Sequence, residues 1–367
     1  MLGPLEAPCQ SCAPEVAALP EGAYTLGPPG CYRSACVSDS SSIRSGVAPR
    51  LVVTLGPSTV GRIAELRRAG ATEFRLNTAH MSAAAVSELV RQVDREAPGT
   101  ACVVDLQGAK MRLGHFEPCR VEAGHQVRFV LEPTDGAIPV PHPELFRAVQ
   151  PGEEISVADG RLRLEVGHVS ATEMTARASV AGVLEPNKGI NRATHPIALG
   201  DFSAHDLTVM DACAGATGAH FAISFVRDGT EAGWLRSRRP AARVILKIER
   251  QEALEAIEHL GCRGDELWVC RGDMGAQLGL GPMARAVHGL EPRRLAVPVL
   301  MAGQVFEHLK EHAEPTRSEV CHLFELLTRG YAGVVLSDET AIGTDSVRAT
   351  RIAAELLREM FRKACAD

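Results

Sequence analysis

The chain has 367 residues with 45% hydrophobic and 23% charged side chains, and its 45 acidic against 39 Lys and Arg residues give a net charge of −6. The length predicts two or three domains, and the lack of any run of about 18 apolar residues argues against a membrane-spanning helix. Mild acidity with only 4% aromatic residues argues against nucleic-acid binding, so we expect a soluble, cytoplasmic protein that acts on small molecules.

Residues 1–48 differ from the rest of the chain because they are rich in Gly, Pro, Ser and Cys and show no hydrophobic period. We expect a flexible, Cys-containing N-terminal extension. Alternatively, Cys9, Cys12, Cys31 and Cys36 could form a zinc knuckle from one C-x2-C and one C-x4-C pair. The segment lacks the features of a secretory signal, and thiols scattered along the chain suit a reducing cytosol.

From residue 49 onward, short apolar runs of β-forming residues alternate with amphipathic helical stretches. The runs are 51–56, 73–77, 101–106, 221–226, 243–249, 266–272, 297–303 and 333–339. Eight strands with helices between them predict a (β/α)8 TIM barrel, built from residues 49–113 and 188–367. Residues 114–187 contain short alternating stretches broken by Pro and Gly, which predict a small β lid domain inserted after strand 3.

Charged and polar residues follow the predicted strands at their C-terminal ends, where barrel enzymes hold their catalytic groups. In chain order they are Arg75, Asn77, Asp105, Arg227, Lys247, Glu249, Arg271, Asp273, Gln304, Ser337 and Glu339. Glu249 and Asp273 end the fifth and sixth strands, so their carboxylates could meet and hold Mg²⁺ or Mn²⁺, which prefer oxygen ligands. A pair of salt-bridged structural acids is the alternative.

Lys247 is one of only five lysines among the 39 basic residues. It precedes Glu249 by two positions, so both side chains of the strand face the barrel mouth. An ammonium there can neutralise the charge that develops during phosphoryl transfer or enolate formation. The following RGDMG segment, residues 271–275, could open a helix whose backbone N–H groups bind a carboxylate.

The motifs resemble those of the pyruvate kinase family over residues 49–363. The matching pieces, in the order that the family has them, are VVTLGPST, RLNTAH, DLQGAKMR, VADGRL, NKGIN, ISFVR, LKIE, CRGDMG, EPTRSE and LSDETAIG. The resemblance implies conversion of phosphoenolpyruvate and ADP to pyruvate and ATP with Mg²⁺ or Mn²⁺. It also implies that the inserted domain closes over the cleft as a lid, which would exclude water.

The resemblance implies a role for each matching residue. Lys247, Arg75 and Asp105 would be catalytic, and Glu249 and Asp273 would bind the metal ion. The implied substrate-binding residues are Arg271, Gly272, Asp273, Ser224 and Gln304, and the implied nucleotide-binding residues are Arg112, His80, Lys188, Pro57 and Asn77.

The potassium site departs from the commoner family pattern. Lys110 and Ala79 stand where K⁺-dependent members have an acidic residue and a Ser. This resembles the K⁺-independent subgroup, in which an ammonium occupies the place of potassium. We therefore expect that K⁺ is not required and that Lys110 substitutes for it.

Four other departures affect the proton-donor position and the nucleotide side. Gly303 replaces a Thr that is thought to help deliver the proton to enolpyruvate, and Asp338, Ile342 and Asn187 replace a Gly and two Lys residues. One alternative is therefore a paralogue on the same metal and enolate site, catalysing enolisation, decarboxylation of a 2-oxo acid, or phosphoryl transfer to another acceptor. Another is a non-catalytic relative, against which the retention of Lys247 argues.

The resemblance also bears on assembly. The sequence shows no counterpart of the family's C-terminal domain, and Arg317 resembles a residue that reaches the site region of a neighbouring subunit. We expect a homodimer formed through the barrel, with no nucleic-acid or membrane partner.

Overall fold

The computed structural model describes residues 48–364, except 109, 159–160, 193–196 and 198. Cys9, Cys12, Cys31 and Cys36 lie outside the described residues, so both expectations for the N-terminal extension stay predictions. In the described part, no helix combines the length and apolar character needed to cross a bilayer.

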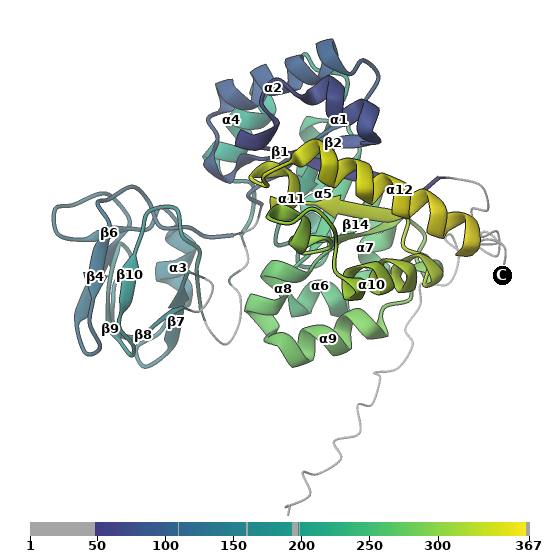
Figure 1. Ribbon diagram of the computed structural model, residues 1–367. Coiled ribbons are helices and arrows are strands. Elements are labelled where there is room, and N and C mark those ends of the chain that lie inside the picture. The colour runs from purple at the N-terminus through teal and green to yellow at the C-terminus, as the bar shows by residue number, and fades with distance from the viewer. Residues whose placement is uncertain (1–47, 109, 159–160, 193–196, 198, 365–367) are drawn as a thin grey trace, which may run out of the picture. The chain divides into compact units, whose positions relative to one another are not determined.

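A closed barrel of eight parallel strands forms the larger part of the described chain (Figure 1). In their order around the barrel, the strands are β1 (Arg50–Leu55), β16 (Gly333–Leu336), β15 (Val299–Ala302), β14 (Glu266–Cys270), β13 (Val244–Ile248), β12 (Ala219–Ile223), β3 (Cys102–Leu106) and β2 (Glu73–Asn77). Every adjacent pair runs parallel. The predicted (β/α)8 barrel is confirmed.

Helices connect the strands and cover the outside of the barrel. They are α1 (Ile63–Ala69), α2 (Ala83–Glu96), α4 (Ala204–Ala212), α5 (Thr230–Arg238), α6 (Gln251–Glu255), α7 (Ile257–Arg263), α8 (Arg271–Leu278), α9 (Leu280–Gly289), α10 (Arg317–Thr328), α11 (Asp338–Ala341) and α12 (Ser346–Ala364), with 3-10 helices η1 (Pro57–Thr59), η2 (Thr78–His80), η3 (Pro292–Arg294) and η4 (Glu307–Lys310). In α10, Leu323, Leu326 and Leu327 are buried at helical spacing and pack into the outer core. The amphipathic pattern thus sets which face of a helix meets the barrel.

A second, smaller domain follows β3 and has its own apolar core. A six-stranded sheet has the order β11 (Ile190–Arg192), β7 (Glu154–Val157), β8 (Leu162–Val169), β9 (Glu173–Ala178), β5 (Gln126–Val130) and β6 (Ile138–Pro139), accompanied by the pair β10 (Gly182–Leu184) and β4 (Cys119–Val121) and by α3 (Pro143–Ala148). Met111 and Ile190, which flank the predicted segment 114–187, belong to this core. The predicted β domain inserted after strand 3 is confirmed.

Side chains inside the barrel form layers because successive residues of a strand point to opposite sides. Val52, Val103, Ala222, Ile245, Trp268, Leu300 and Val335 make a buried apolar layer. Two positions further along five of these strands stand Thr54, Asp105, Ser224, Lys247 and Cys270. The polar mouth of the barrel therefore rests on an apolar layer.

A buried ion network occupies the opposite, N-terminal end of the barrel. Arg50 NH1 lies 2.7 Å from Glu266 Oε2 and 3.2 Å from Glu73 Oε1. Arg243 pairs with Glu73 and lies 3.7 Å from Glu266 Oε2. The Glu266 side chain is only 1% exposed, and its Oε1 also accepts from Trp268 Nε1 at 2.5 Å. Its removal would leave this buried N–H without an acceptor and the two arginines with Glu73 alone.

We expect Glu266→Ala to lower the free energy of unfolding by about 1–3 kcal/mol, the cost of leaving a buried donor, here Trp268 Nε1, without its acceptor. Denaturant unfolding measures the loss. The matched control is Glu291→Ala, which removes the exposed partner of Arg294 at 3.0 Å; it should cost less than about 1 kcal/mol. Equal effects of the two variants would contradict a structural role for the network.

Candidate active site

Three charged side chains from three strands converge at the C-terminal mouth of the barrel. Asp105 Oδ2, at the end of β3, lies 2.8 Å from Arg75 Nε and 2.7 Å from Arg75 NH2 on β2. The same oxygen lies 3.1 Å from Lys247 Nζ on β13. Asp105 is 3% exposed, so it joins two cations in a nearly water-free place.

Lys247 has two further partners. Its Nζ donates to Ser224 Oγ at 2.8 Å and lies 2.8 Å from Glu249 Oε1. Ser224 Oγ in turn donates to Asp105 Oδ1 at 3.1 Å. The lysine is therefore fixed in position by three neighbours.

The chain reverses sharply after β12, which ends at Ile223 and not at residue 226 as the apolar run predicted. Phe225 adopts a left-handed conformation with φ of +57°, which is rare for a bulky residue. Its backbone N–H donates to Glu249 Oε2 at 2.7 Å. Strain at this turn is thus offset by a charge-assisted hydrogen bond that orients Glu249.

The mutual arrangement of these charges sets their pKa values. Burial opposes the charge on Lys247, but Asp105 and Glu249 raise its pKa above the ordinary value. Burial likewise opposes the charge on Asp105, but Lys247 and Arg75 bring its pKa below the ordinary value. For Glu249, burial outweighs the attraction of Lys247, and its pKa is raised. Lys247 and Asp105 are therefore both charged at neutral pH.

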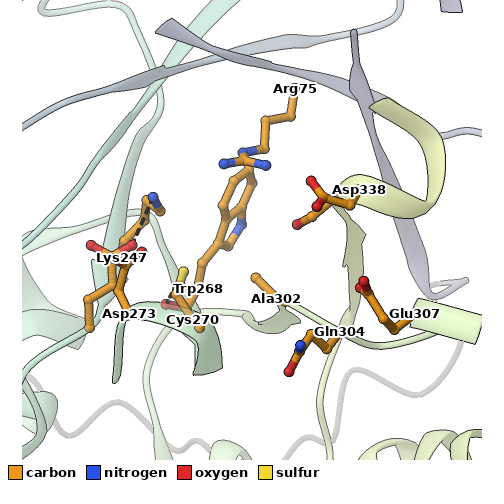
Figure 2. Close-up of a pocket in the computed structure, with 13 residues that line it drawn as sticks. Arg75, Lys247, Trp268, Cys270, Asp273, Ala302, Gln304, Glu307 and Asp338 are labelled. Carbon is orange, nitrogen blue, oxygen red and sulfur yellow. Dashed lines mark hydrogen bonds and ion pairs between the residues drawn. The ribbon is translucent and has the colours of Figure 1, made fainter. Parts of the chain in front are cut away.

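A cavity of about 260 Å³ opens at this mouth (Figure 2). It is lined by Arg75, Lys247, Glu249, Trp268, Cys270, Gly272, Asp273, Ala302, Gly303, Gln304, Glu307, Ser337 and Asp338. In Figure 2, Lys247 and Asp273 stand close together on one wall, and Glu307 and Asp338 stand on the opposite wall. The cavity thus combines a cationic end with several carboxylates.

The donor set on the first wall fits a hard divalent ion. Glu249 Oε1 is buried and makes no hydrogen bond of good geometry, although Lys247 Nζ is near. The charge of Asp273 contributes to the raised pKa of Glu249, so the two carboxylates act on each other. Within the described residues, no group of three or more His, Cys, Asp or Glu side chains could hold a metal. Two carboxylates suit Mg²⁺, which commonly takes its other ligands from water and substrate.

Lys110 lies beside this pair of carboxylates. Its Nζ is 3.6 Å from Asp273 Oδ1 and 4.2 Å from the centre of the Phe225 ring. The side chain is only 5% exposed. A fixed ammonium therefore stands next to Asp273, although its predicted role in place of K⁺ stays a prediction.

The other residues predicted for substrate binding differ in their placement. Gly272 and Gln304 line the cavity. Ser224 lies behind it, bonded to Lys247 and Asp105. Arg271 is not among the lining residues, because its guanidinium donates to the carbonyls of Gly303 and Gln304.

Of the residues predicted for nucleotide binding, Arg112, Lys188, Pro57 and Asn77 are not among those that line the cavity. Arg112 NH1 donates to the carbonyl of Asn187 at 2.9 Å, and Lys188 Nζ lies 3.5 Å from Glu185 Oε2. Pro57 opens η1, and the Asn77 side chain accepts from the N–H of Ala79 at 3.2 Å. The side chain of His80 lies outside the described residues.

Several residues of the site were not predicted from the sequence. Thr54 accepts a hydrogen bond from Arg75 NH1 at 3.0 Å, and Trp268 and Cys270 line the cavity. All three occupy inward positions, so strict alternation along β1 and β14 would have found them. Glu307 belongs to η4, which follows an irregular loop, and no periodic signal marks it.

The fold and this charged mouth define a (β/α)8 barrel protein with an inserted β domain and a site suited to an anionic ligand. The chain belongs to the pyruvate kinase family, because the family model "Pyruvate kinase, barrel domain" matches residues 48–350. The predicted family is thereby confirmed.

Individual relatives agree with this result. The chain is 32% identical over 334 residues to a pyruvate kinase of Methylorubrum extorquens, covering 84% of this chain and 69% of the relative. It is 27% identical over 327 residues to a pyruvate kinase of Aeropyrum pernix, covering 86% and 71%. The crystal structure of pyruvate kinase from Pyrobaculum aerophilum superposes with a TM-score of 0.72 at 27% identity, covering 85% of this chain and 73% of that one.

Proposed function

We propose that the protein transfers the phosphoryl group of phosphoenolpyruvate to ADP, giving pyruvate and ATP, with Mg²⁺ or Mn²⁺ held by Glu249 and Asp273. The observation that carries the proposal is the pairing of two cations, the buried Lys247 and the partly exposed Arg75, through Asp105 at one cavity. Membership of the pyruvate kinase family supports it.

Three residues of the cavity contact the substrate in this proposal. Arg75 and Lys247 bind oxygens of the phosphoryl group and stabilise the negative charge that develops as the enolate forms. The backbone N–H of Gly272, at the start of α8, binds the substrate carboxylate. When bound, a divalent ion neutralises negative charge on substrate oxygens.

The remaining predicted residues belong to the same proposal. Arg112, His80, Lys188, Pro57 and Asn77 bind the nucleotide, and the inserted β domain closes over it as a lid. Closure excludes water and strengthens the electrostatic interactions of the site. We further propose a cytoplasmic homodimer.

A direct assay tests the function. Purified protein is mixed with phosphoenolpyruvate, ADP and Mg²⁺, and pyruvate and ATP are followed together, with excess EDTA as the control. We expect turnover of roughly tens per second, near the median for enzymes. Turnover below about 0.01 per second, far under that median, would contradict the proposal.

A second candidate function rests on Gly303. A Cβ built there would meet the N–H nitrogens of Gly272 at 3.4 Å and Arg271 at 3.7 Å, so the place of a side chain is free beside the site. A larger 2-oxo acid could use this space for enolisation or decarboxylation. Metal-dependent binding of oxalate without binding of ADP would favour this candidate.

If the ammonium of Lys110 takes the place of K⁺, the turnover rate should not depend on potassium. We expect the parent to turn over at the same rate, within twofold, in K⁺ and in tetramethylammonium salts. Lys110→Glu places a carboxylate beside Asp273, and like charges at this distance repel unless a cation lies between them. Its turnover should fall about tenfold in tetramethylammonium and recover in K⁺. A K⁺-stimulated parent, or a variant indifferent to K⁺, would count against the assigned role of Lys110.

A further inference from the structure

The turn after β15 forms one wall of the cavity and has an unusual backbone. Gly303 and Gln304 both adopt the left-handed conformation, with φ of +82° and +54°, and both line the cavity. For Gln304 this conformation costs about 1–3 kcal/mol. Neighbouring structure must therefore hold the turn in place.

Arg271 holds this turn in place. Its Nε and NH2 donate to the carbonyl of Gly303 at 3.1 and 2.8 Å, and NH2 also donates to the carbonyl of Gln304 at 2.9 Å. Arg271 is also the first residue of α8, directly before Gly272 and Asp273. One side chain thus ties the turn to the helix that carries the proposed carboxylate and metal positions.

His322 of α10 completes the arrangement. Arg271 NH1 lies 2.8 Å from His322 Nε2. A guanidinium can only donate, so Nε2 must accept and the imidazole must be neutral, with its proton on Nδ1. Nδ1 faces Glu325 Oε2 at 3.8 Å.

The surroundings of His322 favour this neutral form. Burial and the positive charge of Arg271 lower its pKa, Arg329 also lowers it, and Glu325 opposes the shift. Protonation would remove the acceptor and set a second cation against the guanidinium. The contact is therefore sensitive to acid.

We propose that Arg271 and His322 form a clamp that positions the Gly303–Gln304 turn against the start of α8. Arg271 is then a positioning residue and not a ligand of the substrate. The clamp matters for turnover because small displacements of groups around a reacting centre are costly. This catalytic consequence rests on the function proposed above, whereas the holding of the turn does not.

Four variants test the clamp. Arg271→Gln removes the fork of donors, and His322→Leu removes the acceptor. His322→Gln keeps an acceptor that cannot be protonated. His259→Leu is the matched control, because the exposed His259 accepts through Nε2 from Arg263 Nε at 3.3 Å and neither residue lines the cavity.

Hydrogen exchange at the amides of residues 303–305 gives a readout that needs no turnover. We expect exchange to accelerate at least about tenfold in Arg271→Gln and His322→Leu, because local opening becomes easier. His322→Gln should exchange more slowly than His322→Leu, and His259→Leu should match the parent. Unchanged exchange in both clamp-breaking variants would overturn the proposal, even if the parent proved inactive towards phosphoenolpyruvate.

Kinetics supply the second readout. Arg271→Gln and His322→Leu should lower kcat about tenfold or more, with KM for phosphoenolpyruvate within threefold of the parent. The fall in kcat of the parent at acid pH should be weaker in His322→Gln. A KM that rises a hundredfold in Arg271→Gln at unchanged kcat would instead mean that Arg271 binds substrate. An identical acid limb in parent and His322→Gln would refute the protonation of His322.

Discussion

Lys247→Met should lower the turnover of phosphoenolpyruvate and ADP by at least about a hundredfold, the scale seen when one electrostatic stabiliser is removed from an active site. Methionine retains an unbranched apolar chain as far as Cε but removes the ammonium that lies against Asp105, Glu249 and Ser224. Steady-state kinetics with saturating Mg²⁺ measures the loss.

Two further variants make this result interpretable. Lys247→Arg keeps a positive charge, and it should be more active than Lys247→Met even though its planar fork fits the site less well. Arg294→Met removes a cation whose side chain is 79% exposed and should leave turnover unchanged. Near-parental turnover of a folded Lys247→Met protein would refute the role assigned to the lysine.

Asp105→Asn should also reduce turnover by about a hundredfold, because it removes the negative charge that holds two cations in one geometry. The pH profile gives a second signature. Among the groups that raise the pKa of Lys247, Asp105 is the largest contributor, so its loss must lower that pKa. The activity of the variant should therefore decline at a lower pH on the basic side than the activity of the parent.

Asp211→Asn is the matched control for this variant, since Asp211 is exposed on α4. Initial rates between pH 6 and about 11.5, a range that brackets the ordinary pKa of lysine, would compare the profiles. A parent and an Asp105→Asn variant with the same basic limb would show that Lys247 does not sense Asp105.

Most of the site residues that could be predicted from the sequence were found from the alternation of inward and outward residues along strands. Lys247 and Glu249 share a face of one strand, and parallel strands bring their C-terminal ends to one edge, so a charged mouth followed from spacing alone. Which of these charged side chains pair with one another could not be predicted from spacing. Asp105 contacts Arg75 and Lys247 from other strands, and such pairings depend on the three-dimensional register of the barrel.

Backbone reversals were also not predictable from the sequence. The run FAISFV reads as a strand to residue 226, but β12 ends at Ile223 because Phe225 is left-handed. Hydrophobicity alone does not distinguish a buried strand from a buried turn. Arg271 illustrates a related limit, since the direction of a long, flexible side chain is set by acceptors such as the carbonyl of Gly303.

The apolar layer inside the barrel has a consequence for how substitutions at the two ends of the barrel combine. Val52, Trp268 and Val335 belong to the layer between the ion network at one end and the charged mouth at the other. Trp268 contacts both groups, because its Nε1 donates to Glu266 Oε1 at 2.5 Å and the same residue lines the cavity. Substitutions at Glu266 and at the mouth should therefore combine non-additively. Selection for heat tolerance at Glu266 would then be constrained by selection on substrate at the opposite end.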